Sequence, residues 1–216
     1  MSKKREVMRK YNLTDAQLKK SADQLVILIN RDITYFEMRN FTPAKLTEFK
    51  TAINTFENIS ADEIMEAKTM MATEEKNAAR TTLILKLRTA LLMAKFVFGQ
   101  HTPQYRSFGD ADYAEQTDEK LYRNAQLLIS ACTTYLVDLT PEGMTTQLIA
   151  DIKAARIAFD NAIDQQYLSN KQRDIMTSLR INTGNALYDL LVKYTEIGKD
   201  IWYAVKEAHY NDYIIY

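Results

Sequence analysis

The stretch LILKLRTALLMAKFVF, Leu83–Phe98, decides the fold of this chain. Its apolar residues recur at spacings of three and four, which is the period of an α-helix and not that of a β-strand. The recurring residues are Ile84, Leu87, Leu91, Ala94 and Phe98. Because apolar residues also occupy most of the other positions, we expect a central helix that is buried on all sides.

A membrane span is the alternative interpretation of the same stretch. Sixteen helical residues rise about 24 Å, which is less than the ~30 Å thickness of the hydrocarbon layer. Lys86, Arg88 and Lys95 also lie inside the run, and each would cost about 2.5–3.5 kcal/mol at the centre of a bilayer. The stretch therefore predicts the core of a protein, and we expect no membrane span.

A second stretch repeats the pattern 103 positions later, at Leu187, Leu190, Tyr194, Ile197 and Ile201. The same offset relates pairs at the start of each half and before each long helix, namely Thr14/Thr117, Asp15/Asp118, Leu18/Leu121, Ala22/Ala125 and Phe56/Phe159. This agreement predicts that one helical unit occurs twice.

The composition favours an all-α fold, because five glycines and three prolines in 216 residues leave few chain breaks. Helix starts are marked by capping residues at Thr14, Thr42-Pro43, Ser60, Thr117, Thr140-Pro141 and Ser169. They predict six main helices, arranged as a duplicated three-helix unit in one up-and-down bundle or two fused bundles. The third helix would run from Ser60 to Phe98, with a kink near Thr73–Lys76.

These signals divide the chain into four segments. Residues 1–13 form a basic N-terminal arm, 14–109 the first helical repeat, 110–206 the second repeat, and 207–216 an aromatic C-terminal tail. Twenty-eight basic residues balance twenty-eight acidic ones, so no global field draws the protein to nucleic acid or to membranes.

The basic arm is the one stretch that departs from this balance. Its cations are candidates for binding phosphates or an anionic surface, the alternative being a solvated and frayed terminus. They are Lys3, Lys4, Arg5, Arg9 and Lys10.

Signals for catalysis, cofactors and metals are weak. His101 and His209 have no cysteine or histidine at ligand spacing, and the glycine-rich phosphate-binding and nucleophile motifs do not occur. Cys132 is alone and falls on an apolar helical face, so we expect a buried, unreactive thiol. We therefore expect no enzymatic activity, no cofactor and no metal, and, in the absence of a secretory signal, a cytoplasmic protein.

Three polar residues interrupt the apolar parts of the two long helices or lie just before them: Arg80, Asn182 and Asn185. Buried polar groups need hydrogen bonds. Two interpretations follow, a structural polar network that fixes helix register, or a small-ligand pocket shared by the two halves.

The C-terminal tail is rich in large apolar and aromatic residues, which we expect to dock on a protein surface. Docking back on the same chain and insertion into a partner, including a second copy, are both open. The candidate partner-binding residues are Trp202, Tyr203, Tyr210, Asp212, Tyr213, Ile215 and Tyr216.

Two short signatures, Phe98-Gly99 with Pro103-x-Tyr105-Arg106-x-Phe108-Gly109, and Gly198-Lys199-x-Ile201 with Tyr210-Asn211-Asp212-Tyr213, resemble those of a family of uncharacterised bacterial helical proteins. The resemblance covers most of the chain from about Thr14. It implies a bacterial origin and an all-helical fold, but no activity. We thus expect a structural or protein-interaction module that binds a protein partner or itself. The alternatives are an anion binder that uses the basic arm and a small-ligand-binding bundle.

Overall fold

The computed structural model describes residues 7–59, 62–109 and 111–214 of the chain, and within these ranges it contains helices and turns but no strand. The predicted all-α fold is therefore confirmed. The helices divide between two compact units, which are described separately. Unit 1 comprises residues up to Met65 together with Gln172–Tyr216, and unit 2 comprises Glu66–Lys171.

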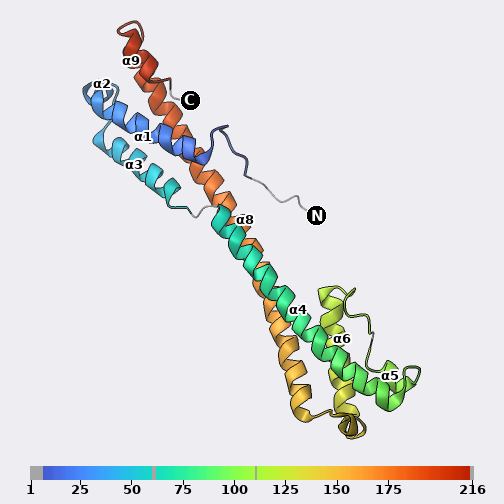
Figure 1. Ribbon diagram of the computed structural model, residues 1–216. Helices are drawn as coiled ribbons and strands as arrows, with labels where there is room; N and C mark the ends of the chain where they lie inside the picture. The colour runs from blue at the N-terminus through green and yellow to red at the C-terminus, as the bar shows by residue number, and fades with distance from the viewer. Residues whose placement is uncertain (1–6, 60–61, 110, 215–216) are drawn as a thin grey trace. The chain divides into compact units, whose positions relative to one another are not determined.

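Unit 1 begins with three helices, α1 (Asp15–Arg31), α2 (Ile33–Glu37) and α3 (Pro43–Glu57). In Figure 1, α1 and α3 lie beside each other and beside the orange, C-terminal part of α8 (Thr146–Trp202). A short helix, α9 (Glu207–Asp212), follows α8. The core of the unit consists of apolar side chains from α1, α2, α3 and α8, together with Tyr213, which follows α9: Leu18, Leu25, Ile29, Phe36, Phe49, Ile53, Leu187, Leu191, Tyr194 and Tyr213.

Unit 2 contains most of α4 (Asp62–Phe98), then α5 (Pro103–Arg106), α6 (Asp118–Thr134), α7 (Leu136–Leu139), the 3₁₀ helix η1 (Thr140–Glu142) and the first part of α8. Its core also consists of apolar side chains, with one face of α4 packed against α6 and α8. The fully buried members are Leu83, Leu87, Ala90, Ala94, Phe108, Tyr113, Leu121, Ala125, Leu128, Cys132, Leu139, Ile152 and Phe159.

The predicted helix starts are confirmed at three places. Thr14 accepts a hydrogen bond from the backbone of Gln17, whose side chain accepts from the backbone of Thr14 in return, which is a complete capping box. Thr42 and Thr117 cap α3 and α6 in the same manner through their hydroxyl groups. The expected start at Ser60 lies outside the described residues.

The number and limits of the helices differ from the prediction. The first helix ends at Arg31 instead of near Asn40, because Asp32 leaves the helical conformation with φ −107° and ψ 22°. The expected fifth and sixth helices are one continuous helix of 57 residues, α8, so Ser169 starts no helix. It begins after Thr145, which caps it, whereas Thr140-Pro141 forms a 3₁₀ turn. Likewise α4 is continuous through Thr73–Lys76.

The expectation that Leu83–Phe98 is buried on all sides is wrong for one face. Leu83, Leu87 and Ala94 are fully buried, but other large apolar residues of the same helix face the solvent. The exposed ones are Leu85, Leu92 and Phe96, with 50–64% of their surface accessible. The apolar stretch therefore contains a core-facing side and a second apolar side that its own unit does not cover.

Candidate functional site

A buried carboxylate organises the end of unit 1. Asp32, only 3% exposed, stands between α1 and α2 and accepts hydrogen bonds from the indole Nε1 of Trp202 at 3.0 Å and the hydroxyl of Tyr213 at 2.8 Å. The guanidinium of Arg31 donates to both of its oxygens, at 2.9 and 2.8 Å. The third guanidinium nitrogen of Arg31, Nη1, donates to Asp212 of α9 at 2.6 Å. We call these five residues the Asp32 cluster.

The pKa values in this cluster follow from burial and hydrogen bonding. Burial alone would raise the pKa of Asp32, but the hydrogen bonds from Arg31, Tyr213 and Trp202 outweigh it and bring the pKa below its ordinary value. Burial and the adjacent Asp32 carboxylate both raise the pKa of Tyr213. At neutral pH, Asp32 is therefore ionised and Tyr213 is a hydrogen-bond donor, which is the arrangement that the geometry requires.

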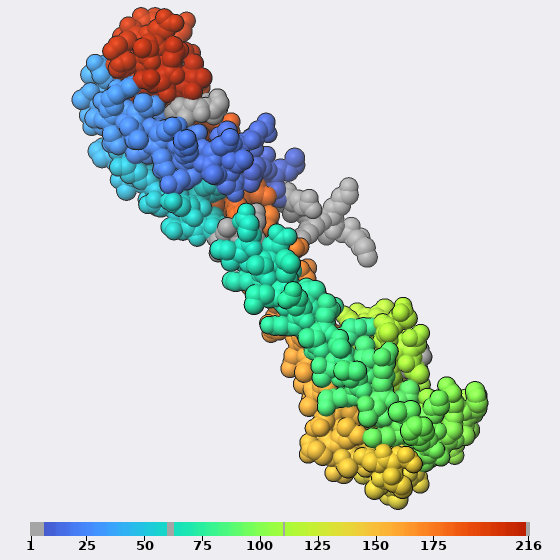
Figure 2. All heavy atoms as spheres, viewed as in Figure 1, coloured from blue at the N-terminus to red at the C-terminus, as the bar shows by residue number. Residues whose placement is uncertain are grey.

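The structure thus places part of the aromatic tail in the core of its own chain. Tyr213 is fully buried, and its ring fills the space beside Gly198 of α8, where an added Cβ would lie 2.1–2.6 Å from ring atoms. Trp202 is 6% exposed. Figure 2 shows α9, in red, directly against the blue N-terminal helices of the same unit. Two of the candidate residues, Ile215 and Tyr216, lie outside the described residues.

Residues at the end of α8 and at the start of the tail remain accessible and surround a surface pocket of about 420 Å³. Tyr203 and Val205 are 73% and 71% exposed, and Tyr210 is half-buried with its ring 6.3 Å from that of Tyr203. Tyr35 of α2, 46% exposed, packs on Trp202 with ring centroids 4.8 Å apart. We call Tyr35, Trp202, Tyr203, Val205 and Tyr210 the end surface.

Backbone geometry holds the end surface in place. Ala204 adopts a left-handed conformation with φ 57°, and the backbone amides of Val205 and Lys206 both donate to the carbonyl of Trp202, at 3.0 and 3.2 Å. This arrangement closes the C-terminus of α8 and directs Tyr203 and Val205 outward. Glycine is the usual marker of a left-handed residue at the end of a helix, and because position 204 is an alanine this turn could not be predicted.

The described part of the basic arm is engaged within unit 1. Arg9 pairs with Asp15 at 2.8 Å, and Lys10 pairs with Asp189 of α8 at 2.6 Å. These pairs reduce the charge that either cation can offer to an external anion. The remaining candidates, Lys3, Lys4 and Arg5, lie outside the described residues.

The three interrupting polar residues belong to different units, Arg80 to unit 2 and Asn182 and Asn185 to unit 1. The side chain of Asn185, which lies in unit 1, accepts from the backbone amide of Lys10 and donates to the carbonyl of Met8, both at 2.8 Å. Arg80, in unit 2, donates to the carboxylate of Asp118 and to three loop carbonyls. Asn182 is exposed. Arg80 therefore holds the segment before α6 against α4, and Asn185 holds the segment before α1 against α8.

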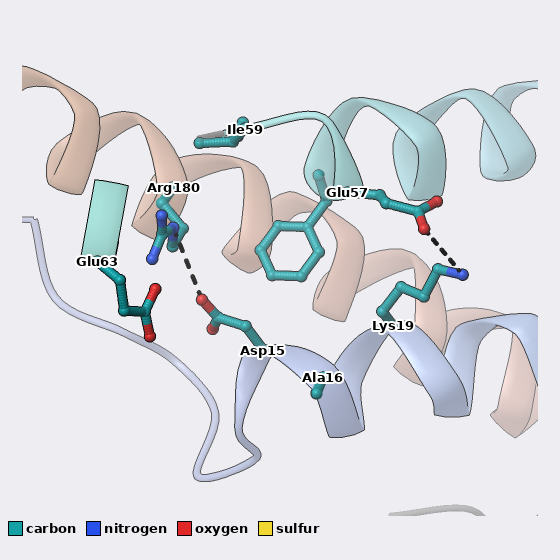
Figure 3. A pocket seen from close by; sticks show the side chains of 8 residues that line it. Asp15, Ala16, Lys19, Glu57, Ile59, Glu63 and Arg180 are labelled. Carbon is teal, nitrogen blue, oxygen red and sulfur yellow. Dashed lines mark ion pairs between the residues drawn. The ribbon is translucent and has the colours of Figure 1, made fainter. Parts of the chain in front are cut away.

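A charged pocket of about 400 Å³ lies elsewhere in unit 1, between the start of α1 and the end of α3 (Figure 3). Arg180, nearly buried, faces Asp15 at 3.8 Å, and Lys19 pairs with Glu57 at 3.2 Å. Glu63 completes the charged lining, and Phe56 contributes apolar surface. Cations and carboxylates alternate around the opening, so the pocket suits a small zwitterion better than a simple anion.

Histidine and cysteine side chains are the usual candidates for a reactive or metal-binding centre. In the described part of the chain, no group of three or more histidine, cysteine, aspartate or glutamate side chains is placed to hold a metal ion. The ring of His209 packs on Trp202, with centroids 4.5 Å apart, and its Nδ1 has no hydrogen-bond partner among the described residues. Cys132 is fully buried, as predicted, and burial raises the pKa of its thiol to about 12.

Sequence reasoning named Trp202, Tyr203, Tyr210, Asp212 and Tyr213 but missed the other members of the cluster and the end surface, which are Arg31, Asp32, Tyr35 and Val205. An Arg-Asp pair inside an apparently continuous amphipathic helix looks like solvated surface, and only the break at Asp32 turns the carboxylate inward.

In the described ranges, none of the helices is both long enough and apolar enough to cross a membrane. No family model, no curated protein and no solved structure matches the chain, so its resemblance to a bacterial helical family stays a prediction.

Proposed function

We propose that the protein is a non-enzymatic interaction module and that two copies associate through the end surface of unit 1. The observation that carries this proposal is the exposure of Tyr203 and Val205, each above 70%, beside an apolar pocket. Aromatic anchors next to a preformed pocket are typical of the energetic centres of protein interfaces. The Asp32 cluster fixes the surface before binding, so that little ordering entropy is lost on association.

A second copy is the partner that the charges favour. The pocket is flanked by Lys206 and Glu207, which carry opposite charges. In a two-fold symmetric contact the same surface meets itself, so each lysine can face the glutamate of the other copy. The chain also carries no formal net charge at pH 7, which removes the long-range repulsion that keeps charged proteins apart.

We further propose that the fold arose from duplication of a three-helix unit. Support comes from the burial of side chains. Residues of α4 and α8 that are 104 positions apart, not 103, agree in whether they are buried or exposed. Buried pairs are Leu83/Leu187, Leu87/Leu191, Ala90/Tyr194, Leu91/Thr195 and Ala94/Gly198. Thr42 and Thr145, which cap α3 and α8, are 103 positions apart. In this proposal the long helix of each repeat packs with the first two helices of the other repeat.

Measuring mass against concentration tests the association. Light scattering after gel filtration should show the mass rising from 25.0 kDa towards twice that value as wild-type protein is concentrated. The double variant Tyr203→Ser/Val205→Ser should remain at the lower mass. Removing the whole tail would be a poorer test, because Tyr213 belongs to the core.

Val137→Ser is the matched control, since Val137 is 84% exposed and belongs to unit 2. It should associate like the wild type. A wild-type protein that stays monomeric at every concentration, or a double variant that associates normally, would refute self-association through this surface.

A further inference from the structure

The exposed side of α4 in unit 2 has the pattern of a helix-pairing seam. Along the helix, Ala78, Thr82, Leu85, Thr89, Leu92 and Phe96 follow one another at spacings of 4, 3, 4, 3 and 4, and all six are exposed. This is the a/d spacing of a coiled coil. We call these six residues the α4 seam.

The threonines do not make the α4 seam hydrophilic. The hydroxyl of Thr82 donates to the carbonyl of Ala78 at 3.0 Å, and that of Thr89 donates to the carbonyl of Leu85 at 3.1 Å. With the hydroxyls occupied by their own helix, the seam consists of methyl groups between Leu85, Leu92 and Phe96. These three side chains are 59%, 50% and 64% exposed.

Unit 1 shows that the fold does not require an apolar surface here. At the offset of 104 that aligns the buried positions, the residues corresponding to Leu85, Thr89, Leu92 and Phe96 are Asp189, Lys193, Glu196 and Asp200. All four are exposed, and three of them form ion pairs within unit 1. The same face of the same kind of helix is therefore an ordinary charged surface in one unit and an apolar seam in the other.

The flanks of the α4 seam identify the kind of partner. With Leu85 and Leu92 at d positions, the flanking e and g positions hold Lys86, Arg88 and Lys95 and no acidic residue. Arg88 and Lys95 are exposed and form no ion pair with any residue in the described ranges, and Lys86 makes only a 4.0 Å contact with Asp151. In paired helices, the charges at e and g select the partner.

We propose that the α4 seam binds an amphipathic helix of another protein that has apolar a and d residues and acidic e and g residues. A second copy fits less well, because its seam has the same basic flanks and offers no acidic e or g residue, and antiparallel pairing brings Arg88 towards Lys95 of that copy. A membrane surface fits less well, because the seam is a narrow a/d stripe and interfacial helices present a broad apolar face. This proposal is independent of the self-association of unit 1.

Synthetic peptides provide the test with the full-length protein. Fluorescence anisotropy is measured with a labelled four-heptad helical peptide that has leucine at a and d and glutamate at e and g. The comparison peptide differs only in carrying lysine at e and g. The glutamate peptide should bind at least about tenfold more tightly, and added salt should weaken its binding.

Variants of the protein test which of its residues contact the peptide and which peptide charge they prefer. Leu85→Ser/Phe96→Ser should lose most of the binding, whereas Val137→Ser, which changes a more exposed apolar residue of unit 2, should bind like the wild type. Arg88→Glu/Lys95→Glu should reverse the preference in favour of the lysine peptide. Circular dichroism of each variant verifies that it remains folded.

Three results would overturn the proposal. The first is absence of binding of the glutamate peptide at about 100 μM, a concentration at which a contact of this kind should be measurable. The second is binding that Leu85→Ser/Phe96→Ser leaves unchanged. The third is binding of wild-type protein to phosphatidylserine vesicles that Phe96→Ser abolishes while the peptide does not compete, which would make the seam a membrane contact.

Discussion

A single carboxylate, Asp32, joins α1, the end of α8 and the C-terminal segment. Replacing it with asparagine keeps the size but removes the charge that Arg31, Trp202 and Tyr213 all contact. Because hydrogen bonds to a buried charge contribute about 1.5–3 kcal/mol each, Asp32→Asn should lower the free energy of unfolding of unit 1 by at least about 2 kcal/mol. Urea unfolding followed by tryptophan fluorescence measures this, since Trp202 is the only tryptophan of the chain.

Asp212→Asn is the control at the same scale. Its carboxylate contacts Arg31 but is 40% exposed, so the loss should stay below about 1 kcal/mol. Equal effects of the two substitutions would show that the burial of Asp32 does not matter.

The lowered pKa of Asp32 also predicts how stability depends on pH. In acid the unfolded chain binds a proton at this carboxyl before the folded chain does. The contribution of Asp32 is therefore fully present above the unfolded pKa and is lost as the pH falls through the folded pKa. Urea midpoints reported by Trp202 should fall below about pH 4, and the fall should be shallower in Asp32→Asn. A wild-type midpoint that is constant from pH 5 to 3 would contradict this.

At the scale of elements, side chains of the long helices form hydrogen bonds that hold the connecting segments in place. In unit 2, Arg80 of α4 donates to Asp118 at 2.6 Å and to the carbonyls of Tyr113, Ala114 and Gln116. Arg80→Leu should therefore release the segment before α6. Hydrogen exchange of residues 113–120 should accelerate at least tenfold, or by about 1.4 kcal/mol of opening free energy.

Arg88→Leu serves as the comparison, because Arg88 lies on the same helix and forms no ion pair within the described residues. Arg88→Leu should leave the hydrogen exchange of residues 113–120 unchanged. An unaltered exchange rate in Arg80→Leu would mean that the segment is held by other contacts.

The packing of Tyr213 against α8 gives a second prediction at this scale. In a helix interior, Gly→Ala ordinarily stabilises by about 1 kcal/mol. At Gly198 the new methyl would lie 2.1–2.6 Å from the ring of Tyr213, so Gly198→Ala should destabilise unit 1 and shift the Trp202 emission. Lys193→Ala, at an exposed position of α8, should change the stability by less than about 0.5 kcal/mol. Stabilisation by Gly198→Ala would refute this packing.

Much of the element scale could be predicted from the sequence. Capping residues with apolar periodicity located α1, α3 and α6, because both signals act within a few residues of one another. The sequence did not reveal that α8 continues past Ser169, since a capping residue is equally compatible with a helix interior. Nor did it separate the buried side of α4 from the exposed side, because Leu83 and Leu85 are equally apolar and only tertiary packing distinguishes them.

At the scale of the whole molecule, two separate cores predict two separable responses to core mutations. Leu83→Ala removes a fully buried side chain from unit 2, and Leu187→Ala removes one from unit 1. Each should cost about 2–5 kcal/mol. Hydrogen exchange should accelerate for Leu83→Ala in α6 and for Leu187→Ala in α1 and α3, with less effect on the other unit. Equal acceleration of both units by either variant would show a single cooperative core.

The partition into units could not be predicted, because it depends on contacts between residues far apart in sequence. The segments 14–109 and 110–206 were predicted as repeats in sequence. The compact units combine parts of both segments. Asn185 and Met8 are 177 positions apart, and local periodicity carries no information on which helices will meet. The repeat boundaries themselves remain a prediction.

The way in which the units divide the chain sets an order of events during synthesis. Unit 2 is one uninterrupted segment, Glu66–Lys171, so a ribosome finishes all of its parts before it makes Gln172. Helices α1–α3 are made before unit 2, yet their apolar sides cannot be fully covered until Leu187, Tyr194 and Tyr213 have emerged from the ribosome. At roughly 5–20 residues per second, that wait lasts many seconds. Helices α1–α3 are therefore made before unit 2 but complete their packing after it, and they would gain most from a chaperone.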